Sequence, residues 1–315
     1  MSGPKPGCRT RREMQSGSVR DDESKWEYHE QAFRRPPPGE DSTMTMYWVY
    51  DLPNWLFGTL TIFVFLVFGL GGYFRSRKAV CALHVESNSY NDIVGFYFGA
   101  LTVLYGITLG LLMVGVWSNF SDTDQKVSRE AATLSALYHD VSHYPEPIRS
   151  ELQKGLGNYC RDVIDVAWAR QRKGIISMSG RLILRGVEEQ LTSFEPATQG
   201  QMVLHAEVLR QFNLIREQRR MRLDSVRMGL SGDLWALVLI GAAINIAVTW
   251  FFRIKDTKLH VWMTALLSSL LGLMIFLLAA MDHPFRGNLS VGPEAFQIVY
   301  EQTIQAYGHS AGPGK

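Results

Sequence analysis

The chain has 315 residues, with 32 basic and 30 acidic side chains and a net charge of +2. A charge this close to neutral gives no indication of a nucleic-acid partner. The charged residues crowd between a few apolar windows, so the chain is not a uniform globular sequence. Cys8, Cys81 and Cys160 lie far apart without a CxxC or Cys/His spacing. We therefore expect free thiols rather than a disulfide framework or a zinc site.

Four stretches without any charged side chain are long enough to cross a bilayer. They run over 55–74, 93–117, 234–252 and 261–281. At about 1.5 Å per residue, each helix reaches roughly the 30 Å of the hydrocarbon core. Tryptophans lie at or near most of the ends, where their amphipathic rings favour the membrane interface. The sequence therefore predicts an all-α membrane protein with four transmembrane helices.

The spans are expected to pair as two hairpins around a soluble helical bundle. Short connections, 75–92 and 253–260, join the first two and the last two spans. Hairpin 1 then covers 47–117, a water-facing helical domain covers 118–233, and hairpin 2 covers 234–281. Four spans place both termini and the central domain on one side of the membrane.

Both ends of the chain are expected to be tails. Residues 1–46 are rich in Arg, Pro, Gly and acids, and a segment of this composition cannot build a core, so we expect a disordered tail. Met44 and Met46 directly precede the first span and would serve as a translation start. Residues 282–315 are expected to form a C-terminal tail.

The central segment reads as helical. Ser121, Asp122 and Thr123 are N-cap candidates for its first helix. That helix continues with an apolar stripe and is stopped by Pro145 and Pro147. Further helical segments are expected from Ile148, over 182–194 and over 203–228. The stripe of the first helix comprises Val127, Ala131, Leu134, Tyr138 and Val141.

The spans lack the chemistry of active transport. No Asp, Glu, Lys, Arg or His lies inside any of them, which argues against proton-coupled carriers, pumps and voltage sensors. A passive pore needs no such groups. No Ser-His-Asp set, phosphate loop or paired catalytic carboxylates stands out, so we expect neither an enzyme nor a cofactor. His139 and His143 are four residues apart but lack a third ligand, and we expect no metal site.

Small residues line one face of the second span. One interpretation is close helix packing, which small residues permit. The other is a pore wall whose narrow end is near Leu109 and Met113. In the third span, Asn245 is expected to form an interhelical hydrogen bond. The pore-lining or helix-packing candidates are Gly95, Gly99, Thr102, Gly106, Leu109, Gly110 and Met113.

A group of arginines precedes the third span. These side chains would attract anions toward a vestibule or bind lipid head groups, and the alternative is a solvated charged face. The positive-inside rule does not decide the orientation, because both sides of the membrane carry comparable numbers of Lys and Arg. The anion-attracting candidates are Arg216, Arg219, Arg220, Arg222 and Arg227.

Motifs spread over about residues 50 to 300 resemble the bestrophin-like domain family of four-span membrane proteins. Asn91-Asp92 precede the second span, Gly95 lies at its beginning, and Leu234-Trp235 opens the third. The other matching residues are Val127, Glu130-Ala131, Leu134, Leu137-Tyr138, Pro145, Pro147, Arg149, His260, Met263-Thr264, the run Asp282-His-Pro-Phe-Arg-Gly and the run Val291-Gly-Pro-Glu-Ala-Phe.

The resemblance implies kinship with bestrophins, which are pentameric anion channels whose second helix lines an apolar neck. It implies a homo-oligomer, a pentamer by resemblance, that conducts an inorganic anion such as chloride through membrane lipid. It favours a bacterial inner membrane with the central domain in the cytoplasm. The stretch from Asn288 carries no acid until Glu294, so we predict no calcium clasp. The alternative function is a non-conducting scaffold or sensor whose soluble helices bind a partner.

Overall fold

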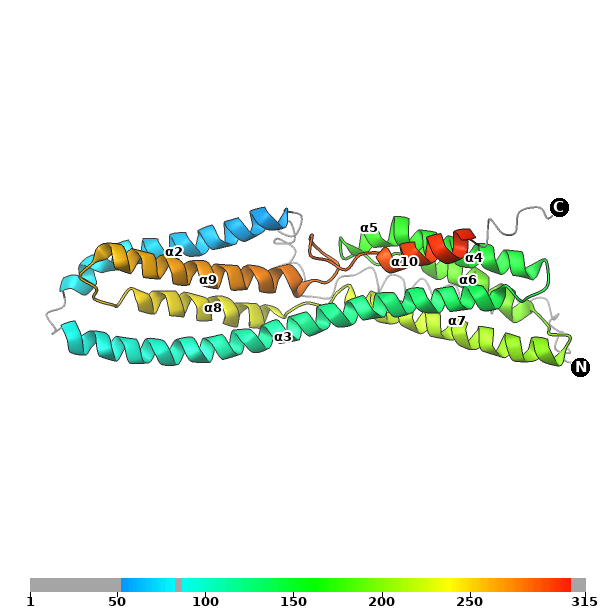
Figure 1. The fold of residues 1–315 in the computed structure, drawn as a ribbon, viewed down its shortest axis with the longest axis horizontal. Helices are drawn as coiled ribbons and strands as arrows, with labels where there is room; N and C mark the ends of the chain where they lie inside the picture. The colour runs from blue at the N-terminus through cyan, green and yellow to red at the C-terminus, as the bar shows by residue number, and fades with distance from the viewer. Residues whose placement is uncertain (1–51, 83–86, 307–315) are drawn as a thin grey trace, which may run out of the picture. The chain divides into compact units, whose positions relative to one another are not determined.

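A computed structural model describes residues 52–82 and 87–306, and all regular structure within them is helical (Figure 1). The expected N-terminal tail over 1–46 lies outside the described residues, as do Cys8, the side chain of Cys81 and the last nine residues of the chain. Cys160 is a free thiol, as predicted, and the structure shows that it is buried.

The four predicted spans are confirmed as helices long and apolar enough to cross a membrane. The last of them is capped by Asp256, whose carboxylate accepts from the backbone N–H of Lys258 at 2.8 Å. Such a cap satisfies a donor that the first helical turn cannot pair internally. The four helices are α2 (Asn54–Ala82), α3 (Ser87–Val141), α8 (Gly232–Thr249) and α9 (Thr257–Asp282).

Helix α3 does not stop at the end of the second span. It runs unbroken for 55 residues, roughly 80 Å at the usual helical rise, and so extends well beyond a bilayer. The predicted N-cap at 121–123 is therefore wrong. Thr123 Oγ1 donates to the carbonyl of Asn119 at 2.8 Å, and Asp122 pairs with Lys126 at 2.7 Å. Both side chains are satisfied along the helix, so they do not begin a new one.

The central helices follow the predicted segments closely. Helix α3 ends at Val141, just before Pro145, and the next helix begins after Pro147. Thr198 caps the longest of the following helices by accepting from the backbone N–H of Gln201. The elements are α4 (Ile148–Asp162), the π-helix η3 (Val163–Ala167), α5 (Trp168–Gln171), α6 (Ser179–Ser193) and α7 (Gln199–Ser225).

The segment after the last span is not a tail throughout. It contains α10 (Glu294–Val299), which continues into the π-helix η4 (Tyr300–Gln305). Phe296 is fully buried in the core formed with the central helices. An apolar anchor of this size brings the segment back onto the bundle, because its burial stabilises the fold by roughly 2–3 kcal/mol.

Helix α3 belongs to two separate apolar cores. Its first part packs against α8 and α9, and its second part packs against α7, α4 and α10 (Figure 1). We call the cluster around Leu109, Val238 and Leu278 the span core. The cluster around Leu134, Leu156 and Phe212 is the distal core. One continuous helix therefore connects both cores.

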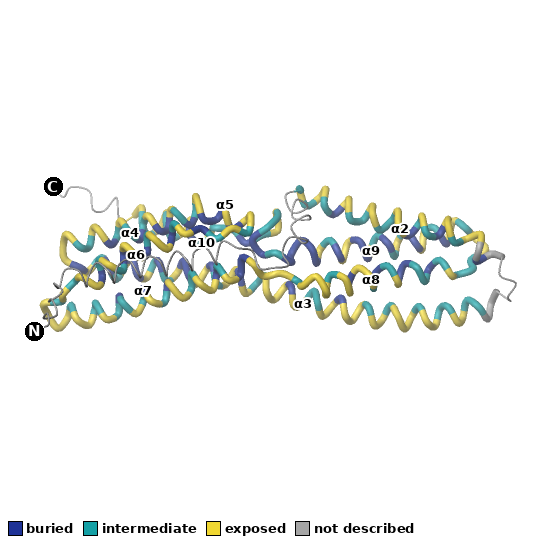
Figure 2. The backbone as a smooth tube through the Cα atoms, turned by 180° about the vertical axis from the view of Figure 1, so that it is seen from behind, coloured by how far each residue is buried: buried dark blue, intermediate teal, exposed yellow. Residues whose placement is uncertain are grey.

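Among the spans, α9 is the most enclosed. About 44% of its most apolar window is buried, against 11% for α2 and for α3. Figure 2 shows α2, α3 and α8 as largely exposed or half-buried, as suits helices with an outer surface facing lipid. The main partner of α2 is α9 rather than its neighbour in sequence, α3. The pairing of the spans into two hairpins stays a prediction.

Candidate functional site: the open face of helix α3

The glycines of the second span face open space. A methyl group added at Gly99, Gly106 or Gly110 would meet no other described atom within 4 Å. Gly95 is nearly as open, because its closest neighbour is a ring carbon of Phe252 at 3.9 Å. No helix of the same chain therefore packs on this edge of α3 within the described residues.

The other members of the predicted row turn toward their own chain. Thr102 Oγ1 donates to Asn245 Oδ1 at 3.0 Å, which confirms the interhelical hydrogen bond expected for Asn245. Leu109 is only 4% exposed and packs in the span core. Met113 is partly buried against the same core. Thr102, Leu109 and Met113 thus pack within the chain, and the glycines beside them form the open edge.

The five candidate arginines do not form one cluster. Arg216 pairs with Glu188 at 2.6 Å. Arg219 is half-buried, burial lowers its pKa, and its guanidinium donates to the carbonyl of Ser177 at 3.4 Å. Arg220 and Arg227 are exposed. Only these last two retain the freedom expected of anion-attracting side chains.

The fifth arginine, Arg222, lies inside the distal core. Its Nε donates to Glu130 Oε2 at 2.6 Å, its Nη2 to Glu130 Oε1 at 3.2 Å, and its Nη1 to Gln171 at 2.8 Å. The guanidinium also stacks between the rings of Trp168 and Phe296, with its carbon 5.6 and 5.7 Å from their centroids. Arg222 is 1% exposed and is therefore unavailable to a free anion.

The Glu130 carboxylate completes the buried network. It is fully buried and also accepts a hydrogen bond from the Tyr159 hydroxyl. Burial raises the pKa of Tyr159, and the adjacent carboxylate adds to that rise. Burial alone would lower the pKa of Arg222, but the Glu130 charge raises it overall. The pair joins α3 to α7, and Tyr159 extends it to α4.

Sequence reasoning missed this network, although a signal was present. Glu130 lies between Val127 and Leu134 on the apolar stripe of α3. An acid in such a position is rarely buried unless it is paired. Its partner lies 92 residues away, so no local pattern connects the two.

A second buried carboxylate marks the junction after α9. Asp282 accepts from the backbone N–H of Leu230 at 2.6 Å and from Trp235 Nε1 at 3.0 Å. The next residue, His283, bonds the carbonyl of Met228 at 3.0 Å. These contacts tie the end of α9 to the start of α8. Within residues 52–82 and 87–306, no three His, Cys, Asp or Glu side chains are arranged to hold a metal ion.

The sequence model of a protein family, the bestrophin-like domain, matches residues 55–296 of this chain. The chain belongs to the bestrophin-like domain family. A search of the curated proteins finds no match for this bestrophin-like chain. Among solved structures it resembles a mutant of a bacterial bestrophin homologue from Klebsiella pneumoniae, with a TM-score of 0.57 and 9% identity. The likeness covers 79% of this chain and 98% of that one. At this identity it establishes the fold alone.

The matched range includes the features described above. It covers nearly all of the four spans, the open edge of α3, the Glu130–Arg222 pair and the junction at Asp282, and it ends at Phe296 in the distal core. The bestrophin-like chain is therefore an integral membrane protein whose family resemblance extends over both cores.

Proposed function

We propose that this chain is a subunit of a homo-oligomeric anion channel, with chloride as the expected ion. Family membership and a bestrophin fold support this proposal. The observation that carries it is the open glycine edge of α3, which no residue in the described ranges 52–82 and 87–306 covers. In the described part of a single chain, the glycine edge of α3 would allow another helix to approach closely, but no other helix packs there.

The glycine spacing supports assembly. Gly95 and Gly99, and again Gly106 and Gly110, are each four residues apart. In lipid, such pairs let helix backbones approach closely, because they leave no side chain between them. We propose that copies of α3 meet along or beside this edge and enclose the ion path. By family resemblance, five copies would form the ring.

The chemistry of the spans supports a passive anion path. The apolar stretches carry no charged side chain, so selectivity would come from backbone dipoles, hydroxyls and an apolar constriction. Exposed Arg220 and Arg227, shortly before α8, would raise the local anion concentration. In this arrangement the distal core lies in the cytoplasm and extends the pathway.

Chloride efflux from liposomes tests the proposal. Purified protein is reconstituted into vesicles loaded with potassium chloride, and efflux is started by adding a potassium ionophore. We expect wild type to release chloride and Gly106→Leu to release much less, because leucine fills the edge that copies of α3 share. Gly71→Leu is the matched control, since Gly71 also meets nothing within 4 Å but lies on α2.

Two results would contradict the proposal, the first by removing conduction and the second by removing the role of α3. The first is wild-type efflux equal to that of protein-free vesicles, which would favour the non-conducting scaffold. The second is equal efflux from the Gly106→Leu and Gly71→Leu proteins, which would remove α3 from the pathway.

A further inference from the structure

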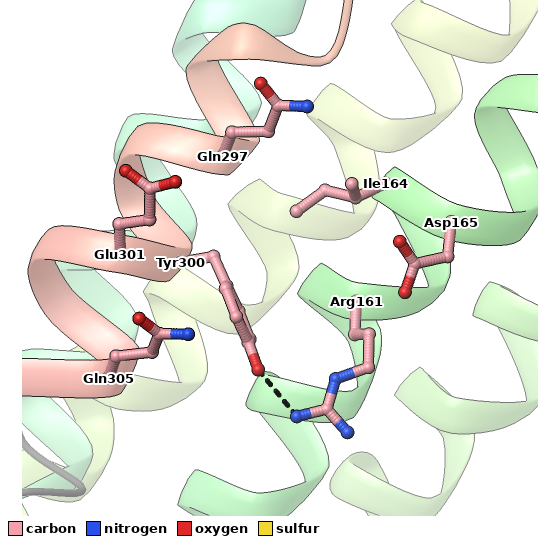
Figure 3. A pocket seen from close by; sticks show the side chains of 7 residues that line it. All are labelled: Arg161, Ile164, Asp165, Gln297, Tyr300, Glu301 and Gln305. Atoms are coloured by element: carbon pink, nitrogen blue, oxygen red, sulfur yellow. Dashed lines mark hydrogen bonds between the residues drawn. The ribbon is translucent and has the colours of Figure 1, made fainter.

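A polar groove lies outside the spans, between α4–η3 and α10–η4 (Figure 3). Its volume is about 580 Å³, within the range of roughly 300–1,000 Å³ that small-molecule sites occupy. Neither the open edge of α3 nor the Glu130–Arg222 pair contributes to it. We call it the π groove, and it is lined by Arg161, Ile164, Asp165, Gln297, Tyr300, Glu301 and Gln305.

Both walls of the π groove change from α- to π-helix where they line it. Ile164 and Asp165 belong to η3, and Tyr300, Glu301 and Gln305 belong to η4. A π-helical turn takes an extra residue and is uncommon in proteins, and it is frequently found at functional sites. The two π-helical turns are a backbone feature, separate from the charges that line the groove. Both observations favour the groove as a functional site.

The positive charge in the π groove is already engaged. Arg161 Nη2 donates to the Tyr300 hydroxyl at 2.6 Å, and the guanidinium carbon lies 5.5 Å from the centre of that ring. The hydrogen bond to Tyr300 is the main reason that the pKa of Arg161 is raised. Arg161 therefore bridges the two walls from within.

The negative charge is not engaged in the same way. Asp165 lies on one wall and Glu301 on the other, as Figure 3 shows. Neither carboxylate forms an ion pair or a hydrogen bond with another residue in the described part of the chain, although the charge of Asp165 adds to the raised pKa of Arg161. Two carboxylates against one guanidinium leave the groove with a net charge of about −1. Its further polar groups are the amides of Gln297 and Gln305.

We propose that the π groove binds a protonated aliphatic amine. The ammonium group would pair with one of the two exposed carboxylates, Asp165 or Glu301, on either wall of the groove. The amide of Gln297 would accept a further hydrogen bond. The alkyl chain would lie on Ile164 and the ring of Tyr300, which provide the apolar surface. This site lies outside the spans, so it does not depend on whether the chain conducts anions.

Calorimetric titration of the full chain in detergent with putrescine tests the proposal. We expect saturable binding of putrescine and none of 1,4-butanediol, which has the same length but no charge. The double variant Asp165→Asn, Glu301→Gln should weaken putrescine binding by at least about tenfold, because each charge-assisted contact is lost. Glu217→Gln is the control, since Glu217 is an exposed acid on α7 outside the groove.

A second variant guards against loss of folding. Gln297→Trp keeps the charge and fills the groove from an exposed position, so it should also abolish binding while the melting temperature stays unchanged. No saturable putrescine binding to wild type would overturn the proposal. So would an affinity that is the same in wild type and in a folded groove variant.

Discussion

Helices α2 and α3 both carry glycines in the membrane, but they use them differently. On α2, a methyl group at Gly69 would lie 2.2 Å from Ser268 Oγ, and one at Gly72 would lie 1.9 Å from the ring of Trp250. On α3, the same addition at Gly106 or Gly110 meets nothing within 4 Å. Gly69 and Gly72 are therefore closed within the chain, whereas Gly106 and Gly110 are open, as is Gly71 between the two closed positions.

The difference separates contacts that fold a single chain from a surface that is available for assembly. In lipid the hydrophobic effect does not press helices together, so close contacts and interhelical hydrogen bonds hold them. The α2 glycines provide both, since Trp250 Nε1 also donates to the carbonyl of Gly69 at 2.9 Å. The α3 glycines offer the same kind of surface, but no described residue of the chain packs against Gly99, Gly106 or Gly110. Substitutions in the closed regions should damage each chain, and substitutions on the open edge should damage the assembly.

The largest loss is expected in the closed distal core. Arg222→Met leaves the buried Glu130 carboxylate without its partner, which costs about 3–5 kcal/mol of stability when one member of a buried pair is removed. Thermal unfolding in detergent, followed by circular dichroism, measures the loss. Adding Glu130→Gln should recover part of it. A single variant that melts like wild type would show that the pair does not hold the core.

A smaller loss is expected where α2 meets α8. Gly72→Ala forces the Trp250 ring to move, and overpacking of this kind costs about 1–3 kcal/mol. Gly71→Ala, one residue along, adds the same atom in open space and should leave the melting temperature unchanged. Equal melting temperatures for the two variants would contradict the closed packing of α2.

On the open edge, the folding of each chain should hardly change. Gly106→Leu should not destabilise the isolated chain, because the position is open and leucine favours a helix more than glycine does. Light scattering on the detergent-solubilised protein should nevertheless report a smaller assembly than wild type. If Gly106→Leu assembled like wild type but its chain were less stable, Gly106 would belong to the packing within one chain rather than to the contact between copies.

The smallest effect is expected from pH at the far end of α3. The hydroxyl of Tyr144 lies 2.7 Å from His205 Nδ1, and burial lowers the pKa of His205 below its usual 6.5. The folded state thus disfavours the protonated ring, so this contribution to stability is complete above about pH 6.5 and is lost as pH falls below it. His205→Gln should reduce the decline in melting temperature between about pH 7.5 and pH 5. An identical decline in both proteins would contradict this contribution.

The sequence predicted where helices form, but it did not predict that the second span and the first central helix are one continuous helix. The four spans follow from uninterrupted apolar stretches, and the distal helices follow from apolar stripes. The helix start predicted at 121–123 was wrong because Asp122 and Thr123 are compatible with a helix interior as well as with an N-cap. Only the packing partners decide between these two, and Thr123 bonds its own helix. The helix over 294–305 was missed because its main anchor is one aromatic side chain, Phe296.

The spacing predicted that the candidate residues lie near one face of α3, but not which of them pack within the chain. The spacing of the glycines placed them near one face, yet Leu109 packs inward and Gly106 remains open. Whether a residue of α3 is buried or open depends on which other helices pack against α3. Sequence periodicity alone does not give this information. Arg222 could not be separated from its exposed neighbours for the same reason, because its partner Glu130 is distant in sequence.

Cross-linking between copies tests the open edge of α3 most directly. In a chain whose native cysteines are replaced, Gly106→Cys is treated in membranes with a short bifunctional maleimide, and Gly71→Cys serves as the matched control. We expect covalent dimers and higher species from Gly106→Cys and monomers from Gly71→Cys. Monomers from both proteins would contradict the claim that a second copy of the chain covers this edge.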